Sequence, residues 1–140
     1  MSSKINAEQV KAAVRRFWDV FTSKSAEALA EFYAHESSVF GSESTRSEPG
    51  RLAAARRNRE YFHLHSILKA APGEVEVVLL GESAAVASYT FKFHATKVAG
   101  ILDKSAEEDI QHGRATQVFA MDPGGVLRIV HEHLSVPDSG

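Results

Sequence analysis

Apolar residues recur at helical spacing along the first part of the chain. Asn6 can cap a helix, and Gln9, three residues later, can reach back to it in a capping box. The apolar residues that follow fall on one face, while basic residues occupy the opposite face. The apolar stripe comprises Val10, Ala13, Val14, Phe17 and Phe21. The pattern therefore predicts a long amphipathic helix whose buried side is aromatic near its end.

Shorter elements are expected next. Ser25 can cap a second helix. Its apolar side would carry Leu29, Phe32 and Tyr33. Residues 38–41 are typical of a short strand, and the polar stretch 42–50, which ends in Pro-Gly, predicts a loop. Residues 51–62 then predict a third helix, because apolar side chains again follow a helical period.

The second half of the chain changes to the pattern of a sheet. Residues 65–70 are expected to be extended, and a loop is expected over 98–108. Strands are predicted over 75–80, 84–94, 110–121 and 126–137, with turns at 72–73, 81–83 and 122–125. Helices followed by long strands predict an α+β fold, with a mainly antiparallel sheet covered by helices on one face. We expect a single domain over residues 1–140.

Alternation along the strands predicts which side chains point inward. Tyr89, Phe91 and Phe93 share one face, and polar side chains occupy the other. The last strand offers two alternating sets of inward residues. These sets are Ile129, His131 and His133, or Val130, Glu132 and Leu134. A β-bulge, which inserts one extra residue, could mix the two sets.

Composition narrows the function classes. The chain has 140 residues, no cysteine and a formal net charge of −2, which excludes disulfides and thiolate chemistry and disfavours nonspecific nucleic-acid binding. No signal peptide or membrane-spanning run is recognisable, so we expect a cytoplasmic protein without a membrane partner. Four arginines, Arg51, Arg56, Arg57 and Arg59, lie on the third predicted helix. A solvated helix face explains them better than an anion-binding surface.

Several blocks of sequence resemble the SnoaL-like branch of the NTF2-like superfamily. They are Phe17-Trp18, Phe32-Tyr33, residues 39–41, Gly50, residues 113–119 and residues 129–135. The last two blocks are also similar to the association domain of calcium/calmodulin-dependent protein kinase II. The sequence departs from these relatives at Leu127, where they usually have tryptophan, and in a longer turn before it.

The resemblance implies a cone, in which a strongly curved sheet wraps around the first helix and leaves a pocket open at one end. It also implies a homodimer through the outer face of the sheet. The superfamily includes isomerases, cyclases, dehydratases and many non-catalytic binding domains, so fold alone does not give function.

Acid–base chemistry is one candidate activity. Ketosteroid isomerases of this fold use a carboxylate base, with a tyrosine and a protonated aspartate as oxyanion donors. The tyrosine position falls near Phe17 or Phe21, and residues 38–41 contain no aspartate, although Glu43 follows them. Two parts of that catalytic set are therefore missing, which argues against steroid-isomerase chemistry.

The histidines of the last strand offer a second possibility. His131 and His133 lie two residues apart, so both leave the same face and could form an acid–base pair or hold a metal. A third metal ligand would have to come from His94, His112 or Glu132. Glu132 points to the opposite face, so we expect no metal and no cofactor. The alternative is that the two histidines hydrogen-bond across the sheet or at a dimer interface.

The sequence favours an apolar pocket that binds a small hydrophobic molecule. Its expected lining is Phe17, Phe21, Phe40, Phe62, Tyr89, Phe91, Phe93, Gln117 and Phe119. Arginines of the kinase association domain would correspond to Phe91 and Gln117, so an apolar ligand is favoured over a carboxylate. Aromatic residues at such spacing can also simply form the core. The alternative function is a cofactor-free isomerase, dehydratase or hydrolase, with catalytic candidates His131, His133, Glu132 and Glu43.

Overall fold

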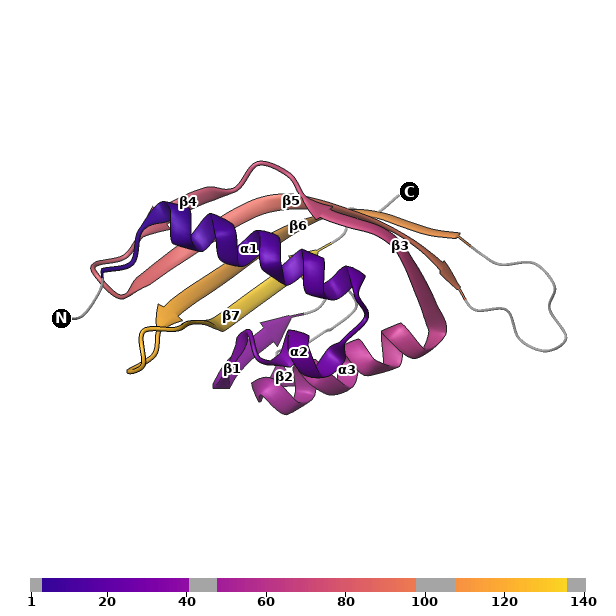
Figure 1. Ribbon diagram of the computed structural model, residues 1–140, viewed down its shortest axis with the longest axis horizontal. Helices are drawn as coiled ribbons and strands as arrows, with labels where there is room; N and C mark the ends of the chain where they lie inside the picture. The colour runs from indigo at the N-terminus through magenta and orange to yellow at the C-terminus, as the bar shows by residue number, and fades with distance from the viewer. Residues whose placement is uncertain (1–3, 41–47, 98–107, 136–140) are drawn as a thin grey trace, which may run out of the picture.

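The structure, a computed structural model, describes residues 4–40, 48–97 and 108–135 (Figure 1). Its helices are α1 (Ala7–Thr22), α2 (Ala26–Ala30) and α3 (Gly50–Leu64). Its strands are β1 (Tyr33–Phe40), β2 (Glu48–Pro49), β3 (His65–Pro72), β4 (Glu76–Leu79), β5 (Ala84–Lys97), β6 (Glu108–Met121) and β7 (Leu127–Ser135). The order of elements is that of an α+β protein, as the sequence predicts.

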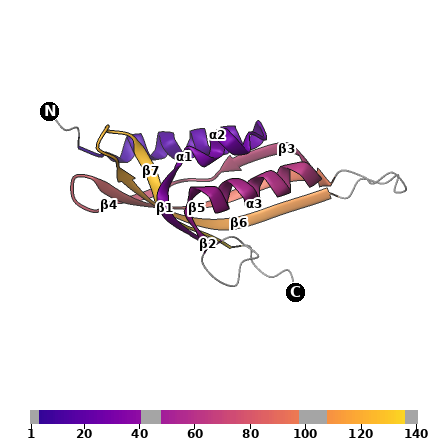
Figure 2. The same cartoon turned by 90° about the horizontal axis from the view of Figure 1, so that it is seen from below.

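All the strands belong to one curved sheet. Its strand order is β2-β1-β7-β6-β5-β3, and β4 pairs with the same strand, β5, as β3 does. Neighbouring strands are antiparallel except β1 and β7, which run parallel. The sheet curls around α1, while α2 and α3 lie at one end of it (Figures 1 and 2). This is the expected cone, and the helices leave the outer face of the sheet uncovered.

The first helix forms as the sequence predicts. The Asn6 side chain accepts a hydrogen bond from the Gln9 amide at 2.9 Å, and the Gln9 side chain accepts one from the Asn6 amide at 3.1 Å. The expected apolar stripe is buried, together with Trp18. Reciprocal capping satisfies two amides that a helix start leaves unpaired. Local sequence and tertiary burial therefore favour the same helix.

The second helix is shorter than expected, and its predicted extension was wrong. The helix ends at Ala30, and Tyr33 begins strand β1, where it pairs with Ile129 of β7. The β1–β7 pairing starts here, so a distant strand overrides the local helical spacing. Strand β2 lies within the expected loop 42–50 and pairs with Ser38 and Val39. The predicted loop 98–108 lies almost wholly outside the described residues.

Strands β5 and β6 are the long strands that the alternation predicts, and both extend further than expected. They pair over their whole length, from Ala84 opposite Ala120 to Thr96 opposite Glu108. Tyr89, Phe91 and Phe93 are buried on the inner face, as their period of two requires. No helix in the described part of the chain is both long and apolar enough to cross a membrane.

Candidate functional site

A β-bulge in strand β7 decides which of its side chains point inward. Val118 of β6 lies opposite His131, but the next residue, Phe119, lies opposite Ile129, so Val130 is the extra residue. Directly opposed residues of antiparallel strands share a face. The bulge therefore turns both Ile129 and Glu132 inward, and it mixes the two alternating sets that the sequence leaves open.

Glu132 is the centre of a buried polar group that we call the Glu132 cluster, formed by Tyr33, Arg57, Gln117 and Glu132. The Tyr33 hydroxyl donates to Glu132 Oε1 at 2.8 Å, and Gln117 Nε2 donates to Oε2 at 2.6 Å. Arg57 Nη2 lies 3.4 Å from Oε1 as an ion pair. Three donors thus converge on one carboxylate from β1, β6 and α3.

The hydrogen bonds continue from this cluster across the inner face of the sheet. The Tyr89 hydroxyl donates to Gln117 Oε1 at 2.6 Å, and Trp18 Nε1 donates to the Tyr89 oxygen at 3.0 Å. Every donor in this series of hydrogen bonds points toward the Glu132 carboxylate. Such alignment strengthens successive hydrogen bonds in a medium of low dielectric constant. This series of hydrogen bonds therefore links α1 to β7 through buried polar atoms.

Both tyrosines remain protonated donors. Burial raises the pKa of Tyr33 well above its usual range, and the negative charge of Glu132 adds to the shift. Burial also raises the pKa of Tyr89, although its hydrogen bond from Trp18 acts in the opposite direction. A desolvated phenolate next to a carboxylate is unfavourable. At neutral pH each hydroxyl can therefore donate to its acceptor but cannot act as a base.

Arg57 is the member of the cluster that reaches solvent. Its side chain is 25% exposed, whereas the Glu132 side chain is fully buried. Arg51, nearly two turns earlier in α3, donates to the Tyr33 carbonyl at 2.8 Å and fixes the helix on β1. The sequence interpretation of these arginines as a solvated face holds for Arg56 and Arg59, which are exposed, but not for Arg57. The helix therefore contributes one charge to the interior.

Two further buried polar groups lie on the same elements. Asn58 Nδ2 of α3 and Ser37 Oγ of β1 are buried, and neither has a hydrogen-bond partner within the described part of the chain. Buried polar atoms in proteins are nearly always hydrogen-bonded, so each exception calls for an explanation. The α3 and β1 elements thus present polar atoms that are not used by the protein's own packing.

Most of the residues expected to line a pocket are buried inside the cone. They are Phe17, Phe21, Phe62, Tyr89, Phe91, Phe93, Gln117 and Phe119. Their aromatic rings also contact neighbours outside this set: Trp18 stacks on Phe91 with ring centroids 4.9 Å apart, and the Phe17 ring centroid lies 6.1 Å from that of Tyr33. The side chain of Phe40 is outside the described residues, as is Glu43. The aromatic group is therefore contiguous with the Glu132 cluster.

The two histidines of β7 lie on the opposite, outer face. His131 Nδ1 is 2.7 Å from the Ser38 hydroxyl of the neighbouring strand, and His133 is exposed. The structure therefore does not bring either histidine together with Glu132. No group of three potential metal ligands occurs among the described residues.

The sequence pattern does not predict Tyr33 and Arg57 as residues of the site. Tyr33 was expected on a helix, so its position beside β7 could not be foreseen. Arg57 belongs to a run of four arginines that suggests solvent exposure. The usable signal was Glu132 itself, because a carboxylate on the inward face of a strand needs buried donors.

Comparison with known proteins supports the fold. Residues 10–139 match the model of the SnoaL-like domain. A candidate calcium/calmodulin dependent protein kinase II association domain from Xanthomonas campestris superposes with a TM-score of 0.79 at 18% identity, covering 99% of this chain and 97% of that one. A ketosteroid isomerase-like protein from Erwinia carotovora atroseptica gives 0.77 at 15% identity, covering 96% and 99%.

A third similar structure is a candidate dehydratase of the NTF2-like family from Streptomyces avermitilis. It superposes with a TM-score of 0.74 at 19% identity, covering 94% of this chain and 97% of the other. No curated protein matches the sequence significantly. The structural relatives are too distant to show more than the fold, whereas the domain match spans most of the chain. The chain therefore belongs to the SnoaL-like domain family and has the fold of NTF2-like proteins.

Proposed function

We propose that this protein binds a small, mainly hydrophobic molecule inside the cone, with the polar group of that molecule at the Glu132 cluster. The observation that carries the proposal is the fully buried Glu132 carboxylate, whose solvent-reaching partner is Arg57. Replacing a buried ion pair by apolar side chains is often neutral or stabilising, so such a pair is weak evidence for a purely structural role. A buried charge among aromatic side chains is typical of a ligand site.

The unpartnered polar atoms support the same position for a ligand. Asn58 Nδ2 can donate and Ser37 Oγ can donate or accept, and both are buried on the elements that carry Arg57 and Tyr33. A ligand with one carbonyl or hydroxyl group would satisfy these atoms, while its apolar body would contact the aromatic residues. The chemistry favours a neutral, largely apolar ligand with a single polar end.

Trp18 provides a direct test, because it is the single tryptophan of the chain and lies within the aromatic group. We expect a steroid enone or a medium-chain ketone to change Trp18 fluorescence in a saturable way. Arg57→Ala should weaken that binding about tenfold, which corresponds to about 1.4 kcal/mol. The matched control is Arg16→Ala, an exposed arginine on the solvent side of α1. Equal binding by both variants, or no saturable change, would contradict the proposal.

Catalysis is a second candidate, favoured by the contact between a protonated phenol, Tyr33, and a carboxylate, Glu132. These are the group types with which ketosteroid isomerases move a proton beside a carbonyl. The geometry favours binding instead, because three donors already occupy the carboxylate oxygens. Incubation with enolisable ketones in D₂O decides between them: catalysis requires deuterium incorporation that Glu132→Gln abolishes, and none is expected.

We further propose a homodimer through the outer face of the sheet. Val78, Val86 and Val118 lie opposite one another on three neighbouring strands, and Val78 is 59% exposed. A symmetric interface uses the same patch on both copies, so an apolar row can cover itself. Light scattering should give twice the chain mass, and Val78→Glu with Val118→Glu should give the monomer. A wild-type monomer at high concentration would refute the dimer.

A further inference from the structure

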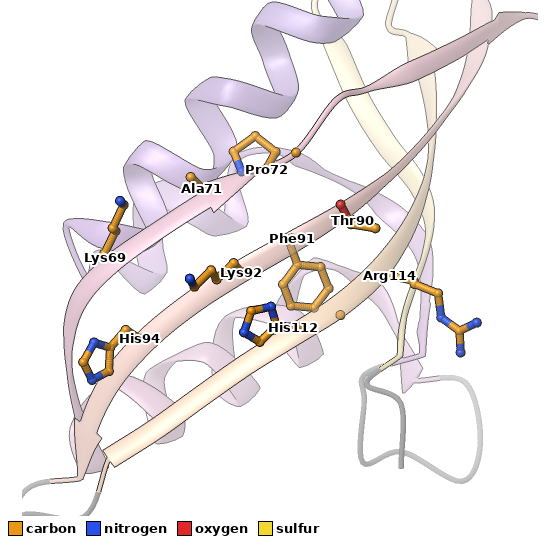
Figure 3. Close-up of a pocket in the computed structure, with 11 residues that line it drawn as sticks. Lys69, Ala71, Pro72, Thr90, Phe91, Lys92, His94, His112 and Arg114 are labelled. Atoms are coloured by element: carbon orange, nitrogen blue, oxygen red, sulfur yellow. The ribbon is translucent and has the colours of Figure 1, made fainter. Parts of the chain in front are cut away.

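The outer face also carries a groove, away from the valine row. It has a volume of about 640 Å³ and lies over β3, β5 and β6. Figure 3 shows basic side chains from all three strands around it, including Lys69, Lys92 and His112. Volumes of this size are typical of small-molecule sites. The groove is on the opposite face of the sheet from the Glu132 cluster.

The charged side chains in the described lining of the groove are all basic. Lys69, Lys92 and Arg114 line the groove together with His94 and His112, and none of the lining residues that the structure describes is acidic. None of the ion pairs found among the described residues involves the two lysines or Arg114. The whole chain has a formal net charge of −2, so three cations without a carboxylate are a local departure from its composition. They create a positive potential in a concave site.

Strand register places these charges close together. Lys92 lies directly opposite His112, and Lys69 lies directly opposite His94. Glu76, which lies opposite Ser88 further along the same face, is outside the groove lining. A bound anion would neutralise part of the positive charge of the lysines and Arg114.

The floor of the groove is apolar. Ala71 and Pro72 contribute to it, and Gly113 adds backbone without a side chain. The Phe91 ring lies on the inner side of Gly113, where a Cβ atom would clash with it, so glycine is required at this position. Apolar atoms below and cations at the rim suit a ligand that has both characters.

We propose that the groove binds a small organic anion, with an apolar body over Ala71, Pro72 and the Gly113 backbone and a carboxylate or phosphate group at Lys92 and Arg114. Arginine and lysine both bind these groups by charge-assisted hydrogen bonds. The site is independent of the proposed interior ligand, which is neutral and meets Arg57.

The test compares naphthalene-2-carboxylate with its neutral amide by calorimetry, and follows the amide signals of Gly73 and Gly113 by NMR. We expect the carboxylate to bind at least tenfold more tightly than the amide and to shift both glycines. Lys92→Gln and Arg114→Gln should each weaken it three- to tenfold, and Arg16→Gln should not. Equal binding of acid and amide overturns the proposal. Naphthyl phosphate, tested in parallel, shows whether a phosphate ester is preferred to a carboxylate.

Two outcomes separate this site from the other proposals. Arg57→Gln should leave naphthoate binding unchanged; loss of binding in that variant would assign the anion to the interior and overturn the groove. The oligomeric state of Lys92→Gln is measured alongside. If that variant alters dimerisation but not anion binding, a second copy of the chain occupies the groove and the anion proposal is wrong.

Discussion

The two faces of the sheet treat charge in opposite ways. On the inner face, Glu132 is fully buried and receives donors from three different elements. On the outer face, Lys69 and Lys92 stand beside histidines without a carboxylate in the groove lining. A buried charge must be paired within the protein because water cannot reach it, whereas an exposed charge can rely on solvent. The inner charge is therefore expected to contribute much more to stability than the outer charges do.

The largest expected effect is on the inner face. Glu132→Ala leaves the Tyr33 hydroxyl and the Gln117 amide without their acceptor, and should lower the free energy of unfolding by about 3–5 kcal/mol. Urea denaturation monitored by Trp18 fluorescence measures it. The matched outer-face control, Lys92→Gln, should stay within about 0.5 kcal/mol of wild type. A loss for Lys92→Gln as large as that for Glu132→Ala would remove the contrast between the faces.

The second largest effect is expected on removal of one donor, the Tyr33 hydroxyl, and it should depend on pH. Tyr33→Phe should lower the free energy of unfolding by about 1.5–3 kcal/mol, because it removes a hydrogen bond to a carboxylate. The raised pKa of Tyr33 means that the folded protein keeps a proton that the unfolded chain releases above about pH 10. The stability contributed by this tyrosine is therefore complete below pH 10 and falls as pH rises further.

Denaturation curves between pH 8 and 11 test that sign. Wild type should lose stability above pH 10, and Tyr33→Phe should lose it less steeply. The pKa of Tyr89 is also raised by burial. The Tyr33→Phe variant should therefore still lose some stability as pH rises above 10. An identical slope in wild type and variant would show that Tyr33 titrates alike in the folded and unfolded states.

A third prediction concerns Gly113, which lines the groove on the outer face and lies next to the Phe91 ring on the inner face. Gly113→Ala should lower the free energy of unfolding by about 1–3 kcal/mol, because the added Cβ meets the Phe91 ring and lies 2.8 Å from the Ser135 carbonyl. The displaced ring should also alter Trp18 fluorescence, since the two rings stack. Gly124→Ala, in the exposed turn before β7, is the control. Equal stability of the two variants would mean that the Phe91 ring does not need the space that Gly113 leaves.

Periodicity predicts most of the fold because burial and spacing agree. The first helix, the long strands and the inward direction of Phe91 and Gln117 all follow from alternation in the sequence. The candidate site is harder, because its geometry depends on an irregularity. The bulge at Val130 turns both Ile129 and Glu132 inward, and no local pattern specifies where that extra residue falls.

Tyr33 shows a second reason why the local sequence does not predict the site residues. Its sequence neighbours favour a helix, and only the parallel pairing with β7, almost a hundred residues away along the chain, makes it a strand residue. Arg57 is a similar case, since its role depends on how α3 packs on β1. Long-range contacts thus supply two of the three donors that hold Glu132.

The smallest expected effect is at Asp122, a half-buried surface carboxylate that also has several donors. Asp122 accepts hydrogen bonds from the Gly124 and Val126 amides at 2.9 Å and lies 3.4 Å from Arg128 Nε. The Val126 amide is the main cause that lowers the pKa of Asp122, so its contribution is present above its unfolded pKa and is lost as pH falls through the folded value. Asp122→Ala should therefore lower the melting temperature slightly at pH 7, and by progressively less as pH falls. Because Asp122 and Glu132 each have three donors, a loss at pH 7 comparable to that of Glu132→Ala would show that the number of donors, rather than burial, sets the cost.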